Sequence, residues 1–382
     1  MNILFYTSDL YHGRERLMPW RTILEIAKVM QKHGHRVIII NGVSENKHLK
    51  SYVYENVHIH SIKKDLNELA KTINSDNTDV LMIECKWRDA IKGFNTLKTV
   101  KCSKYAYFTG GIYDFKSVKL LAQRCGIKNT IPYLLESIVP KKLVIYRLKK
   151  ANFDGAIGLT PLTSNVIRKS GLKNHATILP GKDNFETLKN DNTFLDKYHL
   201  SNKRFLCFTG APAQTRGADL LLQAVDKSKI NDLRVVFLMR NDVGSKFEVF
   251  NKTYAMMKHP ERIIIIRENL TREQLKAFFT SAWYMVLPFI VIPSEIPLTF
   301  FEIMSCGTPI LTFKNGGTSD YLNRGLEIAQ KSIIGLQKGI ENIWTNETLR
   351  YEKSLRAKQL MDSHPTWEKT TELWSYFTKI IN

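Results

Sequence analysis

The sequence predicts an α/β protein built from two doubly wound parallel sheets. Short apolar runs typical of buried strands alternate with stretches of helical spacing, first over residues 2–179 and again over residues 204–313. Such alternation is typical of parallel sheets that carry helices on both faces. At 382 residues the chain is longer than one hydrophobic core usually spans, so two domains are expected.

The expected elements fall into two series. The first series of strands covers 2–6, 36–40, 57–61, 80–84, 105–108, 156–159 and 177–179, with helical patterns between most of them. The second series covers 204–209, 234–239, 262–266, 284–287 and 310–313, with helices at 218–225, 246–257, 272–281 and 298–306. The polar segment 184–202 is predicted to be a linker. Two final helices, 330–361 and 365–381, are separated at Pro365, because proline cannot continue a helix.

Composition and charge limit the class of protein. The hydrophobic fraction of 43% and the charged fraction of 24% are those of a globular protein. No apolar run is long enough to cross a bilayer, and the first residues lack the features of a secretory signal. Five scattered cysteines suit a reduced compartment better than a disulfide framework or a zinc site, so we expect a cytoplasmic protein. The net charge of +20 indicates an anionic partner: nucleic acid, acidic lipid or a phosphorylated substrate.

The segment 293–311 combines a loop, a helix and a strand. Helix formers run from Leu298 to Cys306, with Pro297 ahead of them and Gly307 behind them, and buried strands are expected on both sides. This is the pattern of a βαβ unit.

Two carboxylates accompany this helix, Glu295 in the loop and Glu302 one turn into the helix. The backbone N–H groups of Leu298 and Thr299 lie at the positive end of the helix dipole, which favours anions. The sequence therefore predicts a site for a phosphate flanked by sugar hydroxyls.

Ligands of doubly wound sheets lie at the carboxyl ends of the strands. In the first half these ends lead into the loops 8–13, 84–89 and 109–114. Gly13 is a candidate for phosphate contact, although a tight turn also favours glycine. The three-glycine dinucleotide fingerprint is absent after the first strand, which argues against a nicotinamide enzyme.

The segment 116–150 is strongly basic. It carries nine lysines and arginines and one acid, Glu136, interleaved with apolar residues. A basic amphipathic segment of this kind is typical of anionic membrane surfaces. A solvated helix face over a core stripe is the alternative, and the sequence does not decide between them.

Four segments together point to a family: Phe208–Gly217 (FTGAPAQTRG), 154–160, 179–185 and 294–309. With the two tandem Rossmann-like domains and the kink at Pro365 and Trp367, they resemble the GT-B glycosyltransferases. The similarity is greatest to the large retaining family that includes sucrose, glycogen and phosphatidylinositol mannosyl transferases. The resemblance covers most of the chain and is most specific in the C-terminal half.

The resemblance implies a domain organisation and an activity. Residues 1–183, joined by a C-terminal helix at 365–382, would form the acceptor-binding domain, and residues 184–364 the nucleotide-sugar-binding domain across a cleft. The implied reaction is retaining transfer from a UDP- or GDP-sugar to a hydroxyl of a glycan, lipid-linked or protein acceptor, without cofactor or metal. Nucleic acid is not an expected partner. A nucleotide-sugar epimerase on the same fold and a non-catalytic polyanion-binding protein are the alternatives.

The resemblance also implies roles for individual residues. Arg216 would bind the diphosphate of the donor beside Gly210, with help from Arg240, and Glu302 would accept the ribose hydroxyls. Glu295 would meet the transferred sugar. Arg216, Glu295 and Glu302 are therefore the expected catalytic residues, and the remaining donor-site candidates are Gly13, Ser294, Pro297, Leu298 and Thr299.

The sequence also departs from the family pattern. Seven residues separate the paired glutamates of the family, whereas six separate Glu295 from Glu302, and Ser294 stands at the position of the first. Either Glu295 acts from a shifted loop or Ser294 takes its role. Ala211 replaces an arginine of the family, which would shift leaving-group charge onto Arg216.

Many members keep a histidine in a loop of the N-terminal domain where this chain has Thr109, Gly110 and Asp114, and these three are the acceptor-side candidates. For each charged candidate the alternative is an ordinary solvated surface charge, and that alternative is strongest for Glu295 among the three expected catalytic residues.

Overall fold

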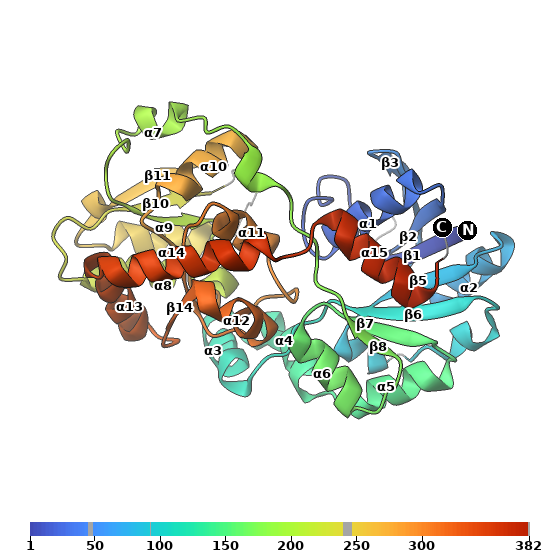
Figure 1. The fold of residues 1–382 in the computed structure, drawn as a ribbon. Helices are drawn as coiled ribbons and strands as arrows, with labels where there is room; N and C mark the ends of the chain where they lie inside the picture. Colours follow the sequence, from blue (N-terminus) through green and yellow to red (C-terminus); the bar gives the residue numbers. More distant parts are fainter. Residues whose placement is uncertain (45–48, 92, 240–246, 381–382) are drawn as a thin grey trace.

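The computed structural model describes residues 1–44, 49–91, 93–239 and 247–380. Two parallel sheets with helices on both faces form the two lobes in Figure 1. This is the fold class expected from the sequence.

The N-terminal sheet has eight strands in the order β3-β4-β2-β1-β5-β6-β7-β8, of which β3 alone is antiparallel to its neighbour. The strands are β1 Asn2–Ser8, β2 Arg36–Val43, β3 Tyr52–Tyr54, β4 Val57–Lys63, β5 Val80–Cys85, β6 Ser103–Phe108, β7 Gly155–Gly158 and β8 His175–Thr177. The helices are α1 Trp20–Lys32, α2 Leu66–Ser75, α3 Phe115–Cys125, α4 Ile127–Ile138, α5 Lys141–Lys150 and α6 Pro161–Lys169.

The C-terminal sheet has six parallel strands in the order β11-β10-β9-β12-β13-β14. They are β9 Leu206–Thr209, β10 Val235–Leu238, β11 Ile263–Ile266, β12 Tyr284–Leu287, β13 Ile310–Phe313 and β14 Leu326–Ala329. The helices are α7 Thr193–Lys197, α8 Ala218–Lys227, α9 Phe247–Ala255, α10 Arg272–Ser281, α11 Leu298–Ser305, α12 Gly316–Leu322, α13 Ile333–Thr345, α14 Glu347–Asp362 and α15 Trp367–Thr378.

Three details differ from the expectations. The sequence analysis did not predict β3 and β14. The helix expected over 330–361 is two helices, because Asn346 leaves the helical conformation and its side chain accepts a hydrogen bond from the backbone N–H of Leu349, which caps α14. The linker expected at 184–202 contains the short helix α7 and buries Phe185 and Leu195 in the core of the C-terminal sheet.

The chain crosses between the lobes twice, and the two crossings are bonded to each other. The backbone N–H of Lys182 donates to the carbonyl of Pro365 at 2.9 Å, and Trp367 Nε1 donates to Asp183 Oδ1 at 2.8 Å. A side chain at Gly181 would meet the backbone of Trp367 at 2.6 Å, so only glycine allows this approach.

After the second crossing, α15 returns to the N-terminal lobe, as Figure 1 shows in red. Trp374 of α15 is fully buried, and its ring lies 5.9 Å from that of Phe5 and 5.5 Å from that of Tyr107. The C-terminal helix therefore completes the core under the first strand.

This packing makes a testable prediction for stability. Trp374→Ala should lower the free energy of unfolding by about 3–5 kcal/mol, because it leaves a large cavity in a packed core. Tyr376→Ala, on the same helix but 88% exposed, is the matched control and should leave stability nearly unchanged. Urea unfolding of both variants measures the difference, and similar midpoints for the two would contradict the docking of α15.

Candidate active site

The candidate site lies where the carboxyl ends of the two sheets face each other. The loop after β6 and the loop after β12 meet there, because Gly110 forms an antiparallel bridge with Ser294. Tyr113 Oη donates to the carbonyl of Ile292 at 2.9 Å. Gly110, an acceptor-side candidate, is thus in direct contact with Ser294, a donor-site candidate.

Arg216 and Gly210 lie together, as the family resemblance implied. β9 ends at Thr209, and Gly210 follows with φ +118°, a conformation that favours glycine. Any side chain at Gly210 would collide with Nη1 of Arg216. The guanidinium lies 5.5 Å from the ring centroid of Phe289, which follows β12. The loop therefore presents a planar cation close to a bare stretch of backbone, an arrangement suited to phosphate.

Helix α11 begins as expected. Pro297 is its N-cap residue and Leu298 its first residue, and no side chain caps the N-terminus. The N–H groups of Leu298 and Thr299 therefore have no capping side chain to satisfy them. Ser294, half-buried, lies just ahead of this helix end.

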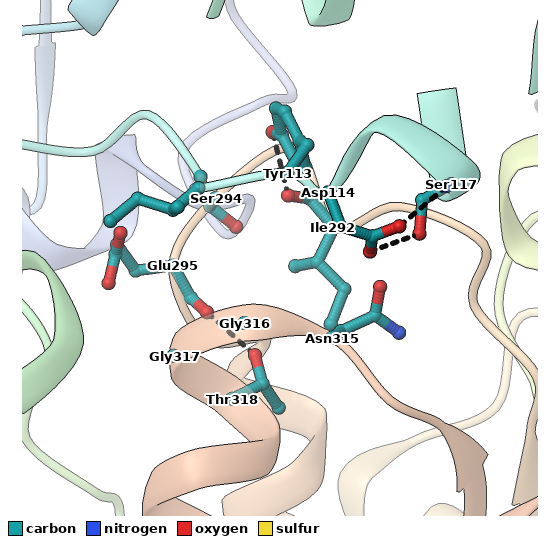
Figure 2. A pocket seen from close by; sticks show the side chains of 12 residues that line it. Tyr113, Asp114, Ser117, Ile292, Ser294, Glu295, Asn315, Gly316, Gly317 and Thr318 are labelled. Carbon is teal, nitrogen blue, oxygen red and sulfur yellow. Dashed lines mark hydrogen bonds between the residues drawn. The ribbon is translucent and has the colours of Figure 1, made fainter. Parts of the chain in front are cut away.

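Glu295 is not a solvated charge, because only 5% of it is exposed. Both of its carboxylate oxygens accept hydrogen bonds from the other domain, from the hydroxyls of Thr160 and Thr163 at the start of α6. Burial raises the pKa of Glu295 to about 7, against the lowering effect of these two bonds. Figure 2 shows the carboxylate directed away from Asp114 and Asn315. In this arrangement Glu295 joins the domains and offers no open face to a sugar.

Glu302 also faces the N-terminal domain. Its Oε1 lies 3.4 Å from Nη1 of Arg21 on α1, and burial raises the pKa of Glu302 above its ordinary value although Arg21 opposes the rise. Arg21 binds Asp183 as well, and Arg272 reaches the same carboxylate at 2.7 Å. Burial disfavours the charged form of Asp183, but the two arginines and Trp367 hold its pKa below the ordinary range. Arg21, Arg272 and Trp367 thus all contact the carboxylate of Asp183.

The three acceptor-side candidates are placed differently from one another. Thr109 is buried and donates to Glu84 Oε1 at 2.8 Å, so its hydroxyl is used inside the N-terminal domain. Asp114 caps α3 by accepting from the N–H of Ser117 at 2.8 Å and from its hydroxyl at 2.6 Å. Gly110 approaches Ser294, and a side chain at Gly110 would meet Glu136 Oε2 at 3.0 Å.

Gly13 is exposed at φ +92°, and its N–H donates to Glu15 Oε2 at 2.7 Å. A Cβ added at Gly13 would meet no described residue within 4 Å. Arg240 lies outside the residues that the structure describes.

The sequence analysis missed several residues of this site. Gly316 and Gly317 begin α12, where a side chain would meet the carbonyl of Ile112 at 2.8 Å or Thr160 Oγ1 at 2.5 Å. Thr318 donates to the backbone carbonyl of Glu295 at 2.6 Å (Figure 2). A glycine pair shortly after a buried strand was the available signal, because close approach of two backbones requires glycine.

One pocket between the domains is small. It is lined by residues 111–114, Ser294 and residues 315–318 and holds about 20 Å³, which is room for about one or two water molecules. A sugar would not fit in this pocket in the arrangement that the structure shows.

Among the described residues no helix is long and apolar enough to span a membrane. In the same residues no group of three or more histidine, cysteine, aspartate and glutamate side chains could hold a metal ion.

Comparison with solved structures defines the fold as that of the GT-B glycosyltransferases. Sucrose-phosphate synthase from Thermosynechococcus elongatus superposes with a TM-score of 0.72 at 12% identity, over 99% of this chain and 98% of the other. A glycosyltransferase from Rickettsia africae gives 0.68 at 14% identity, over 99% and 98%. HepE from Anabaena in complex with UDP gives 0.70 at 10% identity, over the full length of both chains.

A family model matches the sequence of the C-terminal domain. Residues 190–359 match the family model described as "Glycosyl transferases group 1". The resemblance expected from the sequence is therefore confirmed. No curated protein sequence matches this chain.

The buried carboxylate of Glu295 predicts a pH dependence. Its pKa is higher in the folded protein than its ordinary value of 4.5, so between pH 4.5 and about 7 the folded state holds more protons than the unfolded state. Stability should therefore fall as pH rises through this window and stay level above it. Glu295→Gln, which cannot titrate, should lack this part of the slope, as melting temperatures at each pH would show.

The matched control is Glu352→Gln, whose carboxylate is half exposed on α14. A plot of its melting temperature against pH should run parallel to that of the wild type. If the plot for Glu295→Gln also ran parallel to that of the wild type, the buried, titrating contact would be disproved.

Proposed function

We propose that this protein is a retaining glycosyltransferase that moves a sugar from a nucleotide-sugar donor to a hydroxyl of a glycan, lipid-linked or protein acceptor. The observation that carries the proposal is the packing of Arg216 against Phe289, whose ring lies 5.8 Å from that of Phe300 on α11, within a GT-B fold. Solved structures of HepE with UDP and with UDP-glucose support a nucleotide-sugar donor, and a UDP-sugar before a GDP-sugar.

The leaving group determines what the site must supply. When the bond between the anomeric carbon and the phosphate oxygen breaks, positive charge grows on the sugar and negative charge on the departing diphosphate. Fixed donors aimed at that diphosphate lower the barrier. Arg216 provides a planar cation, and the N–H groups of Leu298 and Thr299 provide neutral donors beside it.

The donor replaces Arg21 of the N-terminal domain as the partner of Glu302. In the proposed complex Glu302 accepts hydrogen bonds from the ribose hydroxyls, whereas in this structure its Oε1 lies 3.4 Å from Nη1 of Arg21. Arg21 keeps Asp183 as a second partner, so the exchange leaves neither charge buried alone. Ser294, which lines the pocket, meets the transferred sugar, while Glu295 holds α6 against the C-terminal domain when the cleft closes.

Retention follows from attack on the face that the diphosphate leaves. The acceptor oxygen forms the new bond to the anomeric carbon, and its proton passes to an oxygen of the departing phosphate. No side chain is required as a covalent nucleophile in this mechanism. The reaction is proposed to need no metal, because Arg216 and the N-terminus of α11 neutralise the charge.

The acceptor is proposed to be met at the cytoplasmic face of a membrane. The basic segment 116–150 supports this placement, since anionic lipid attracts clustered lysines and arginines.

Screening donors by thermal shift tests this function. A bound donor at 100 times its Kd should stabilise the protein by about 2.7 kcal/mol, and transfer to an acceptor should then be measured with the donor found. An isomerised nucleotide sugar as product would identify an epimerase. Binding of nucleic acid without any turnover would identify a polyanion-binding protein.

Arg216→Ala should lower turnover by about 10²–10³-fold, the usual effect of removing a group that stabilises developing charge. It should also weaken nucleoside diphosphate binding, as isothermal titration calorimetry would measure. Arg356→Ala, an arginine half exposed on α14, is the control and should behave as the wild type. Normal turnover together with normal affinity in Arg216→Ala would remove this residue from the mechanism.

Chelation should leave the activity intact. Initial rates in excess EDTA should equal those in buffer alone, since the diphosphate charge is met by Arg216 and backbone N–H groups. Complete loss of activity with EDTA, reversed by added Mn²⁺, would show that a metal ion is required.

A further inference from the structure

Helix α4 exposes three isoleucines and buries two of its polar side chains. Ile127, Ile131 and Ile138 are 75%, 45% and 57% exposed, whereas Thr130 and Glu136 are each 3% exposed. Residues four, seven and eleven positions apart share one face of a helix, so the three isoleucines form one outward face. A surface helix of a globular protein normally has the opposite orientation.

Specific polar contacts hold α4 in this orientation. Ser137 Oγ donates to the carbonyl of Tyr113 at 3.3 Å, and the rings of Tyr133 and Tyr113 lie 5.5 Å apart. Glu136 Oε1 lies 3.7 Å from Nε of Arg88. Because the inward face is fixed by these partners, the isoleucine face remains directed outward.

Exposed lysines lie on α4 and on the helices that precede and follow it, whereas three other cations of the segment have partners in the structure. Arg124 pairs with Asp219, Lys141 donates to the carbonyl of Glu136, and Arg147 donates to that of Ile91. The other six basic side chains of the segment are exposed on α3, α4 and α5: Lys116, Lys119, Lys128, Lys142, Lys149 and Lys150. Phe115, Leu143 and Tyr146 add exposed apolar surface on the neighbouring helices.

We propose that the isoleucine face of α4 inserts into the headgroup region of an anionic lipid bilayer, with the exposed lysines of α3, α4 and α5 contacting lipid phosphates. Apolar insertion combined with lysine contacts is the combination that binds a helix to such a surface. A second copy of this chain fits poorly as occupant, because its net charge of +20 would repel the first.

Docking through α4 places the acceptor side of the cleft at the membrane. Tyr113, which packs on α4, also reaches across to Ile292, so the helix adjoins the loops of the candidate site. The acceptor would then be a hydroxyl carried by a lipid-linked molecule. This identification of the acceptor rests on the proposed function, whereas the docking itself does not.

Sedimentation with vesicles tests the docking. The full-length protein should bind vesicles of phosphatidylglycerol and phosphatidylcholine at low salt, bind pure phosphatidylcholine far more weakly, and be released by salt. Ile131→Glu combined with Ile138→Glu should lower the partition coefficient by about tenfold or more, since two buried apolar contacts are replaced by charges. Tyr351→Glu, at a 70% exposed position on α14, is the control and should bind as the wild type.

Each other outcome overturns the proposal. Failure of the wild type to bind anionic vesicles would exclude a membrane. Equal binding by the double variant would assign the docking to another surface. A wild-type dimer that the double variant dissociates, without vesicle binding, would identify a second copy as the occupant.

Two measurements keep these outcomes interpretable. Thermal melting checks the folding of the double variant, and Ile127→Glu, at the most exposed of the three positions, replaces it if the melting temperature falls. Donor hydrolysis measured without vesicles reports on the proposed function separately, so that loss of docking and loss of catalysis are distinguished.

Discussion

A buried carboxylate links the two domains. Glu295 of the C-terminal domain is held by the hydroxyls of Thr160 and Thr163 at the start of α6. An isolated buried carboxylate would be costly, so these partners are required whenever the cleft is closed. Thr160 also accepts from the N–H of Thr163 at 3.2 Å, so the same hydroxyl caps the helix and joins the domains. Gly317 leaves the space that this contact needs.

Glu302 has its charged partner on the other domain. Its Oε1 lies 3.4 Å from Nη1 of Arg21, and Arg21 also binds Asp183. A buried charge without a partner is strongly destabilising, so in the proposed mechanism the ribose hydroxyls of the donor replace Arg21 as the partner of Glu302. Arg21 keeps Asp183 as its partner in that exchange.

The sequence predicts the fold because its signals are local. Buried apolar runs alternate with helical spacing, and Pro297 and Gly307 mark the limits of α11 within about two residues. The meeting of Gly210 and Arg216 also follows from short spacing. The partners of Glu295 lie 135 and 132 residues away, and those of Glu302 lie on α1, so they depend on how the domains face each other.

The basic segment illustrates the same limit. Its charge and apolar content are evident in the sequence, but the inward position of Glu136 and the outward position of Ile131 depend on contacts with the loop around Tyr113. Likewise, the polarity of residues 184–202 predicted a linker, although Phe185 and Leu195 bury their side chains in the C-terminal core.

The paired crossings at Lys182 and Pro365 restrict how the two lobes can move. The two segments are joined by the bonds from Lys182 to Pro365 and from Trp367 to Asp183. An opening that kept both bonds would be a rotation of one lobe about the paired segments. Closing by the same rotation would bring Ser294 back to Gly110, its bridge partner in this structure.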